Sequence, residues 1–248
     1  MDSEAPPGAN PVATKPAGSR QHLLDTAAHL FSTIGFTESG MRQIAQVAGM
    51  QTASVYYHFA SKDLILLEVL KAGLEYTAKA VYAAVAALPA DANARDRVEA
   101  AIAAHLRAVH SNLSYTSVDA KFAGQLPADV AAIIHPLHDE YVRYWRILLE
   151  QAHAEKLLRE ELPTSLTRAL IIGMIQRTTV WFDAKVGPVD VLIAAVLNML
   201  RGMWVEPAAN PKIKPKTKPK TKLKSKASTS KRASSSPARK SAAKTRRR

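Results

Sequence analysis

Residues 43–59 read QIAQVAGMQTASVYYHF, and the small and apolar positions in this segment have the spacing of a helix-turn-helix. Ala45 is small, as a residue must be where two helices cross closely. Gly49 follows at the point where a tight turn between the helices favours a positive φ. Val55 is expected to pack back against the first helix as the apolar anchor of the second. An ordinary helical hairpin is the alternative interpretation of this spacing.

The second helix of a helix-turn-helix lies in the DNA major groove, and its first residues meet the edges of the bases. Here those residues are Gln51, Thr52, Ala53 and Ser54. Their short or amide side chains suit hydrogen bonds to bases and contact with the thymine methyl group. The segment therefore predicts sequence-specific binding to double-stranded DNA.

The next residues, 55–64, read VYYHFASKDL and extend the predicted DNA-binding surface. Tyr56 and His58 offer a hydroxyl and an imidazole at the far end of the second helix. Lys62 stands at the start of the following helix, where its charge and the backbone N–H groups both attract a phosphate. We expect Tyr57 and Phe59 to pack between these short helices and the long helix that follows.

These residues, with Phe31, Gly35-Phe36 and Met41-Arg42 before them and Ser61 to Leu64 after them, resemble the N-terminal domain of the TetR/AcrR family of bacterial transcriptional regulators. The resemblance spans about residues 20–69. It implies an all-helical homodimer of about nine helices without enzymatic activity. Members of this family usually repress transcription, and a small molecule in the C-terminal domain releases the DNA.

The resemblance also implies roles for single residues. Tyr56 and His58 match positions that touch the DNA backbone or bases, and Lys62 matches a lysine that contacts a phosphate. Ser39 matches a capping residue that often reaches a phosphate, and Thr37 offers a second hydroxyl for the same role. Arg42 fits a position near the DNA backbone that is commonly basic. Many members have Ser-Lys-Gly-Thr where this chain has QTAS at residues 51–54. The missing lysine removes a phosphate or guanine contact, so the operator sequence does not follow from the family.

Apolar residues recur at helical spacing throughout residues 20–204, and no strand is expected there. Ser19 is expected to cap the first helix, Asp91 to start the fifth and Thr164 to cap the eighth. The predicted fold class is all-α, with helices at about 20–34, 41–48, 52–59, 61–89, 91–109, 115–124, 128–154, 165–182 and 189–203. The expected organisation is a disordered arm, a helix-turn-helix domain, a ligand-binding and dimerisation domain and a disordered basic tail, at residues 1–19, 20–64, 65–205 and 206–248.

The last two predicted helices carry long apolar stripes. In the family, the corresponding helices pair with their copies as a four-helix bundle, and a two-fold DNA reader needs such a dimer because its half-sites are related by the same symmetry. Packing inside one chain is the alternative for some of these residues. The predicted dimer interface consists of Leu166, Leu170, Gly173, Arg177, Val189, Ile193, Val196, Leu197 and Leu200.

Five large side chains of the middle and last helices could line an apolar cavity for an effector, with ordinary core packing as the alternative. They are Phe122, Leu126, Tyr141, Trp145 and Trp181. The pattern of residues 173–188 resembles, more weakly, regulators of fatty-acid, aromatic-acid and sterol breakdown, several of which respond to acyl-CoA thioesters. Gln176 replaces an Asn of that pattern and Arg177 replaces an aromatic residue. An acyl-CoA or a hydrophobic acid is the effector that this resemblance implies.

The 248 residues carry a formal net charge of +13, and this charge is concentrated at one end. Residues 207–248 hold 16 Lys and Arg and no acidic residue, which leaves −3 for residues 1–206. Such a tail binds DNA of any sequence by releasing counterions, and its affinity falls steeply with salt. An architectural, largely non-specific DNA-binding protein driven by the tail is therefore the alternative function. A solubilising extension without further role is the alternative for the tail.

Several classes of function are excluded or disfavoured. The chain has no Cys, which excludes disulfides, a thiol nucleophile and Cys-ligated metals, and it has no GxGxxG, GxxxxGK[ST] or GxSxG motif. Five histidines suggest a metal site, but without a Glu-x-x-His partner we interpret them as core or surface residues: His105, His110, His135, His138 and His153. We expect no catalytic residue, metal or cofactor. No membrane-spanning run or secretory signal is found, so a cytoplasmic, nucleoid-associated location in a bacterium is predicted.

Overall fold

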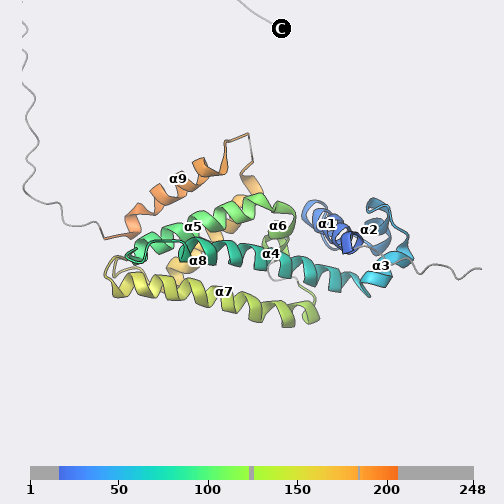
Figure 1. The fold of residues 1–248 in the computed structure, drawn as a ribbon, viewed down its shortest axis with the longest axis horizontal. Helices are drawn as coiled ribbons and strands as arrows, with labels where there is room; N and C mark the ends of the chain where they lie inside the picture. Colours follow the sequence, from blue (N-terminus) through green and yellow to red (C-terminus); the bar gives the residue numbers. More distant parts are fainter. Residues whose placement is uncertain (1–16, 123–125, 184, 206–248) are drawn as a thin grey trace, which may run out of the picture. The chain divides into compact units, whose positions relative to one another are not determined.

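The computed structural model describes residues 17–122, 126–183 and 185–205. Within these ranges the regular structure consists of nine α-helices and one 3₁₀-helix, without a strand, which confirms the predicted all-α fold (Figure 1). The predicted N-terminal arm, apart from its last three residues, and the basic tail lie outside the described residues. The helices are α1 Ala17–Thr33, α2 Met41–Val47, α3 Thr52–His58, α4 Lys62–Ala86, α5 Ala94–Ser111, α6 Leu113–Phe122, α7 Ala128–Ala154, α8 Thr164–Trp181, α9 Val189–Met199 and η1 Leu200–Met203.

The first three helices, which we call the head, share an apolar core with the start of α4, with α6 and with the start of α7. Phe31 of α1, Ile44 of α2 and Val55 of α3 are fully buried in it. The first helix begins at Ala17, so Ser19 lies inside α1, and the prediction that Ser19 caps this helix is wrong. The helix therefore includes Ala17 and Gly18 ahead of Ser19, although Gly is a poor helix former.

Helix α4 connects the head to the remaining helices, α5–α9, which we call the body (Figure 1). The Ser61 side chain accepts a hydrogen bond from the Leu64 N–H at 3.2 Å, which confirms the predicted cap. The first half of α4 contributes Ile65 and Leu66 to the core of the head, and Val81 near its end belongs to the core of the body. One continuous helix is therefore buried in both cores.

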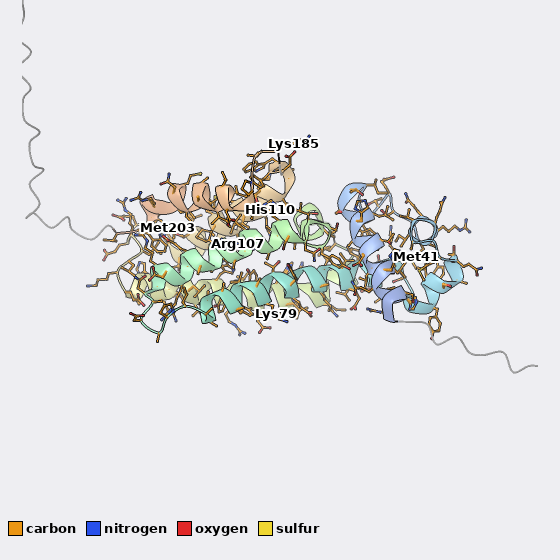
Figure 2. The ribbon with its side chains drawn as sticks, turned by 45° about the horizontal axis from the view of Figure 1, so that its top comes forward. Met41, Lys79, Arg107, His110, Lys185 and Met203 are labelled. Carbon is orange, nitrogen blue, oxygen red and sulfur yellow. The ribbon has the colours of Figure 1, made fainter. Side chains whose placement is uncertain are left out.

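The body packs α5, α7, α8 and α9 around a second core that includes Trp145. Arg107 and His110 lie one turn apart on α5 (Figure 2), and they tie this helix to its neighbours. The Arg107 guanidinium donates to Asp190 of α9 at 2.8 Å, and the His110 ring lies 2.9 Å from the Thr178 hydroxyl of α8. No helix in the described part of the chain combines the length and the apolarity needed to cross a membrane.

Two expected helix starts are wrong. Helix α5 begins at Ala94 because Asn93, not Asp91, forms a reciprocal capping box with Asp96. Helix α8 follows Pro163 and has no side-chain cap, so Thr164 is its first residue rather than its cap. For α5, more than one polar residue precedes the helix, and the spacing alone does not say which one forms the cap. For α8, Pro163 occupies the cap position and no side chain caps the helix.

Candidate DNA-binding surface and ligand cavity

The turn between α2 and α3 has the predicted geometry. Gly49 has a φ of +64°, and the Met50 N–H donates to the Ala45 carbonyl at 2.9 Å. Ala45 and Val55 are buried where the two helices meet. A residue with a side chain at position 49 would be strained in this left-handed conformation. The sequence-based prediction of a helix-turn-helix is confirmed.

Helix α3 presents one face to solvent. Gln51 precedes the helix as its cap residue and is exposed, as is Ala53, whereas Thr52 and Ser54 are half-buried. Tyr56, on the same helix, exposes 53% of its surface. These polar and aromatic groups are available to a partner that lies along α3, because Val55 and Phe59 bury the opposite face of the segment.

Tyr57 and Phe59 differ from each other in their placement. Phe59 is buried as expected, and the Arg20 guanidinium of α1 lies 4.6 Å from the centre of its ring. The expectation that Tyr57 packs inside is wrong, because 76% of this side chain is exposed. Val55 and Phe59 are four residues apart and lie on one helix face, so Tyr57 falls on the opposite face. This spacing was the signal that could have identified Tyr57 as a candidate DNA contact.

The three predicted contacts around the start of α2 fall into two groups. Thr37 and Arg42 are exposed on either side of the start of α2. Ser39 is fully buried, and its hydroxyl donates to the Gly35 carbonyl at 2.6 Å. Gly40 precedes α2 without a side-chain cap, so the capping role expected of Ser39 is wrong. Ser39 instead holds the loop between α1 and α2.

Lys62 and His58 both contact the head itself. The Lys62 ammonium donates to the Phe36 carbonyl at 2.8 Å and lies 4.1 Å from the centre of the Phe36 ring. The His58 Nε2 atom lies 3.3 Å from the Ser19 hydroxyl of α1. Each side chain is half-buried, so a DNA contact by either one would add to a structural role.

A cavity of about 140 Å³ lies in the body, next to α4. Of the five predicted lining residues, Tyr141 is the one found there. Trp145 is fully buried in the body core, Leu126 packs against the core of the head, and Trp181 exposes 57% of its surface, so these three predictions are wrong. The Phe122 side chain lies outside the described residues. The cavity is lined by Leu70, Gly73, Leu74, Thr77, His105, Val109, Tyr115, Thr116, His138, Tyr141, Val142, Ile172 and Gln176.

A histidine–tyrosine pair, which the sequence reasoning did not find, forms one wall of this cavity. The Tyr141 hydroxyl lies 3.1 Å from His105 Nδ1 in the buried interior. Burial lowers the pKa of His105 from 6.5 to about 3, and it raises the pKa of Tyr141. Both groups are therefore neutral at neutral pH.

A second tyrosine joins the cavity to the head. Tyr115 of α6 lines the cavity, and its hydroxyl donates to the Asp25 carboxylate of α1 at 2.6 Å. The Gln21 amide donates to the same hydroxyl at 3.0 Å. Burial and the hydrogen bond to Asp25 raise the pKa of Tyr115, which keeps the phenol protonated. A Cβ atom on Gly73 would lie 3.0 Å from the Tyr115 carbonyl oxygen, so α4 and α6 touch at this point.

The predicted dimer residues of α8 form an exposed row. Leu166 and Leu170 expose 54% and 64% of their surfaces, and Gly173 and Arg177 are exposed as well. Trp181, which was predicted to line the cavity, exposes 57% of its surface at the end of the same row. The neighbouring Val180 is also half exposed. An apolar row of this size on a single chain is typical of an interface.

The α9 residues of the predicted interface are placed differently. Ile193 and Val196 are buried in the core of their own chain, and the prediction is wrong for these two. Val189, Leu197 and Leu200 pack partly against the same core. The exposed apolar row of α9 consists of Val191, Ala195 and Met199. Both faces of α9 are apolar, so the sequence pattern could not tell them apart.

Among the described residues, no three His, Asp or Glu side chains lie close enough together to hold a metal ion. The five histidines that suggested such a site are dispersed. His105 is buried beside Tyr141, His110 contacts Thr178, and the remaining three lie along α7.

A helix-turn-helix head whose second helix, α3, has an exposed face, and which packs through α4, α6 and the start of α7 on a helical body with a cavity, is the architecture of a ligand-responsive DNA-binding regulator. The family described as bacterial regulatory proteins of the tetR family matches residues 23–69. The family described as the tetracyclin repressor-like C-terminal domain matches residues 91–202. The chain belongs to the TetR family of bacterial transcriptional regulators. This family consists of DNA-binding transcription factors without enzymatic activity, in agreement with the sequence analysis.

Several characterised relatives share most of their length with this chain. The transcriptional repressor KstR2 of Rhodococcus jostii is 27% identical over 181 residues, which are 73% of this chain and 84% of the relative. The structure of the ketosteroid regulator KstR2 of Mycobacterium tuberculosis matches 79% of this chain and all of its own, with 23% identity and a TM-score of 0.66. The structure of AibR bound to isovaleryl coenzyme A and operator DNA matches 73% of this chain and 97% of its own, with 21% identity and a TM-score of 0.66. The two structures establish the fold.

The buried His105 predicts a pH dependence of stability. Because its pKa is about 3 in the folded chain and 6.5 when exposed, the unfolded chain binds more protons between these values. The free energy of unfolding therefore falls as the pH is lowered through this window, by up to about 1.4 kcal/mol per pH unit from this group. Urea unfolding of the wild type and of His105→Phe at several pH values measures this contribution. The variant is expected to have a shallower slope below a pH of about 6.5, and equal slopes would contradict the assignment.

Proposed function

We propose that this regulator is a homodimeric repressor that reads a palindromic operator and is released by a small apolar ligand in the body cavity. The observation that carries the proposal is the outward face of α3, where Gln51, Ala53, Tyr56 and Tyr57 are exposed on a helix whose other face is buried. A helix in this position of a helix-turn-helix contacts base edges with its first residues. The contacts proposed for bases and phosphates are those of Thr37, Arg42, Gln51, Thr52, Ala53, Ser54, Tyr56, His58 and Lys62, with Tyr57 added, whereas the buried Ser39 is proposed to hold the loop before α2.

The proposed dimer is supported by the exposed apolar rows of α8 and α9. Their neighbours in the sequence pack inward, so the rows face outward on each helix. Pairing with a second copy would remove these side chains from water, at about 25 cal/mol for each Å² of apolar surface buried. It would also place two heads on one operator, as two-fold half-sites require.

The proposed ligand is supported by the cavity and by the relatives. AibR is described with isovaleryl coenzyme A and KstR2 as a ketosteroid regulator, so an apolar effector, free or as an acyl-CoA thioester, is the proposal for this chain. At about 140 Å³ the cavity is smaller than the 300–1,000 Å³ typical of ligand pockets. A ligand of ordinary size therefore has to push its walls apart, and those walls include α4 and α6.

The proposed coupling between ligand and DNA runs through these two helices. Tyr115 of α6 bonds to α1 of the head, and Leu70 of α4 lines the cavity while it belongs to the core of the head. Displacement of either helix would move the head. The ligand lowers DNA affinity if the arrangement that fits the ligand is not the one that fits the operator.

The basic tail supports a second candidate, an architectural protein that coats DNA without regard to sequence. Its +16 charge is sufficient for strong non-specific binding at low salt. The two candidates differ in what happens when the tail is removed. A cytoplasmic location at the bacterial nucleoid would suit either one.

The test starts with operators selected from a random duplex library and measured by fluorescence anisotropy at roughly 0.2 M salt, where non-specific binding is weak. Tyr56→Ala is expected to weaken operator binding about tenfold or more, a loss of ~1–3 kcal/mol of base or backbone contact. Tyr76→Ala, which removes a similarly exposed tyrosine from α4, is the matched control and should bind like the wild type. Residues 1–206 should still prefer the operator over a scrambled duplex. Loss of that preference, with binding by the tailed chain alone, would favour the architectural candidate.

The dimer proposal predicts the effect of a charge in the α8 row. Leu170→Glu places a carboxylate on the most exposed leucine of this row, where pairing would bury it without a partner. We expect the variant to sediment as a monomer in analytical ultracentrifugation at concentrations where the wild type is a dimer. Leu113→Glu, at an exposed leucine on α6 outside the row, should remain dimeric. A dimeric Leu170→Glu variant would contradict this interface.

A further inference from the structure

We infer that the body cavity selects an uncharged apolar ligand group that bears a carbonyl or hydroxyl oxygen, with His105 as the residue that recognises this oxygen. The inference rests on the proposed function and narrows its ligand class: it excludes an ionised carboxylic acid from the cavity.

The first observation is the chemistry of the walls. The described residues that line the cavity include no Lys, Arg, Asp or Glu. A carboxylate placed there would lose its hydration without gaining a Lys or Arg partner, which is far more costly than burying a neutral oxygen. Two wall hydroxyls already donate to backbone carbonyls: Thr77 to Gly73 at 3.0 Å and Thr116 to Val109 at 2.8 Å. The cavity therefore favours neutral ligands.

The second observation is the geometry of His105. This side chain is 4% exposed and lines the cavity, and its Nδ1 atom pairs with the Tyr141 hydroxyl. The Nε2 atom makes no hydrogen bond to another described residue, and because His105 lines the cavity this atom is available for a partner there. A ligand oxygen in the cavity would supply this partner.

The position of the proton between His105 and Tyr141 determines which ligand group can form a hydrogen bond with Nε2. When the Tyr141 hydroxyl donates to Nδ1, the Nε2–H group donates to a carbonyl or hydroxyl oxygen. In the other tautomer Nδ1–H donates to the Tyr141 oxygen, and Nε2 accepts from a hydroxyl. Burial keeps the imidazole neutral in both cases, so the pair offers one hydrogen bond and no charge.

Three probes with the same ring and the same number of non-hydrogen atoms separate charge from hydrogen bonding: cyclohexyl methyl ketone, cyclohexanecarboxylate and isopropenylcyclohexane. Their affinities for the full chain are measured by calorimetry at neutral pH, where the carboxylate is ionised. The ketone is expected to bind about tenfold or more tightly than the carboxylate. Comparable binding of these two, or no binding by any of the three probes, would overturn the inference.

The role of His105 is tested in the double variant His105→Phe/Tyr141→Phe. Replacing both partners leaves no unpaired polar group, so the variant is expected to keep its fold, which a thermal unfolding curve checks. The preference for the ketone over isopropenylcyclohexane should fall about tenfold relative to the wild type, because the hydrogen bond to Nε2 is lost. An unchanged preference would overturn the role of His105. His153→Gln, at an exposed histidine of α7 outside the cavity lining, is the control and should keep the wild-type preference.

Failure of this inference can be told apart from failure of the proposed function by adding each probe to the operator complex. Release by the carboxylate at least as well as by the ketone would overturn the ligand class and leave the repressor mechanism standing. Selective binding of the ketone without release of the operator would support the ligand class and overturn the proposed repressor mechanism. The coenzyme A thioester of cyclohexanecarboxylic acid is a further probe, which separates a thioester ligand from a free ketone or alcohol. Tighter binding of the thioester or of the free ketone supports a ligand group that is uncharged and bears an oxygen.

Discussion

The arrangement of this regulator depends on α4 being buried in two cores at once. Ile65 and Leu66 are fully buried in the head, Val81 is fully buried in the body, and Leu74 packs against both. A helix held by close packing at both ends cannot shift at one end without disturbing the other, because protein interiors tolerate few voids and little overlap. The contact of Gly73 with the Tyr115 carbonyl adds α6 to the same constraint.

This constraint places the cavity where it can act on DNA binding. The cavity is bounded by α4 and α6, and Tyr115 carries a hydrogen bond from its wall to Asp25 in the first helix of the head. In the proposed function, a ligand in this small cavity presses on α4 and α6, which also pack against the head. The inferred hydrogen bond to His105 would orient the ligand there. The proposed division of DNA binding gives non-specific affinity to the basic tail and the reading of sequence to the outward face of α3.

Much of the fold followed from the sequence because its signals are local. The Gly49 turn, the inward Val55 and the Ser61 cap depend on neighbours within a few residues, and the structure has all three. The cavity did not follow, because it is defined by contacts between α4, α5, α6, α7 and α8, and apolar periodicity cannot tell a cavity wall from a filled core. Trp145 and Tyr141 are four residues apart on α7, yet only Tyr141 lines the cavity. The Tyr115–Asp25 contact joins residues 90 positions apart, which no local pattern encodes.

The most direct measurement is the coupling between ligand and operator in the wild type and in Tyr115→Phe. Operator affinity is measured with and without saturating cyclohexyl methyl ketone. We expect the ketone to weaken operator binding by the wild type about fivefold or more, which corresponds to the usual coupling free energies of ~1–3 kcal/mol. Tyr115→Phe should bind the ketone as well as the wild type does but transmit a much smaller effect. Equal weakening in both proteins would contradict a route through Tyr115 and Asp25.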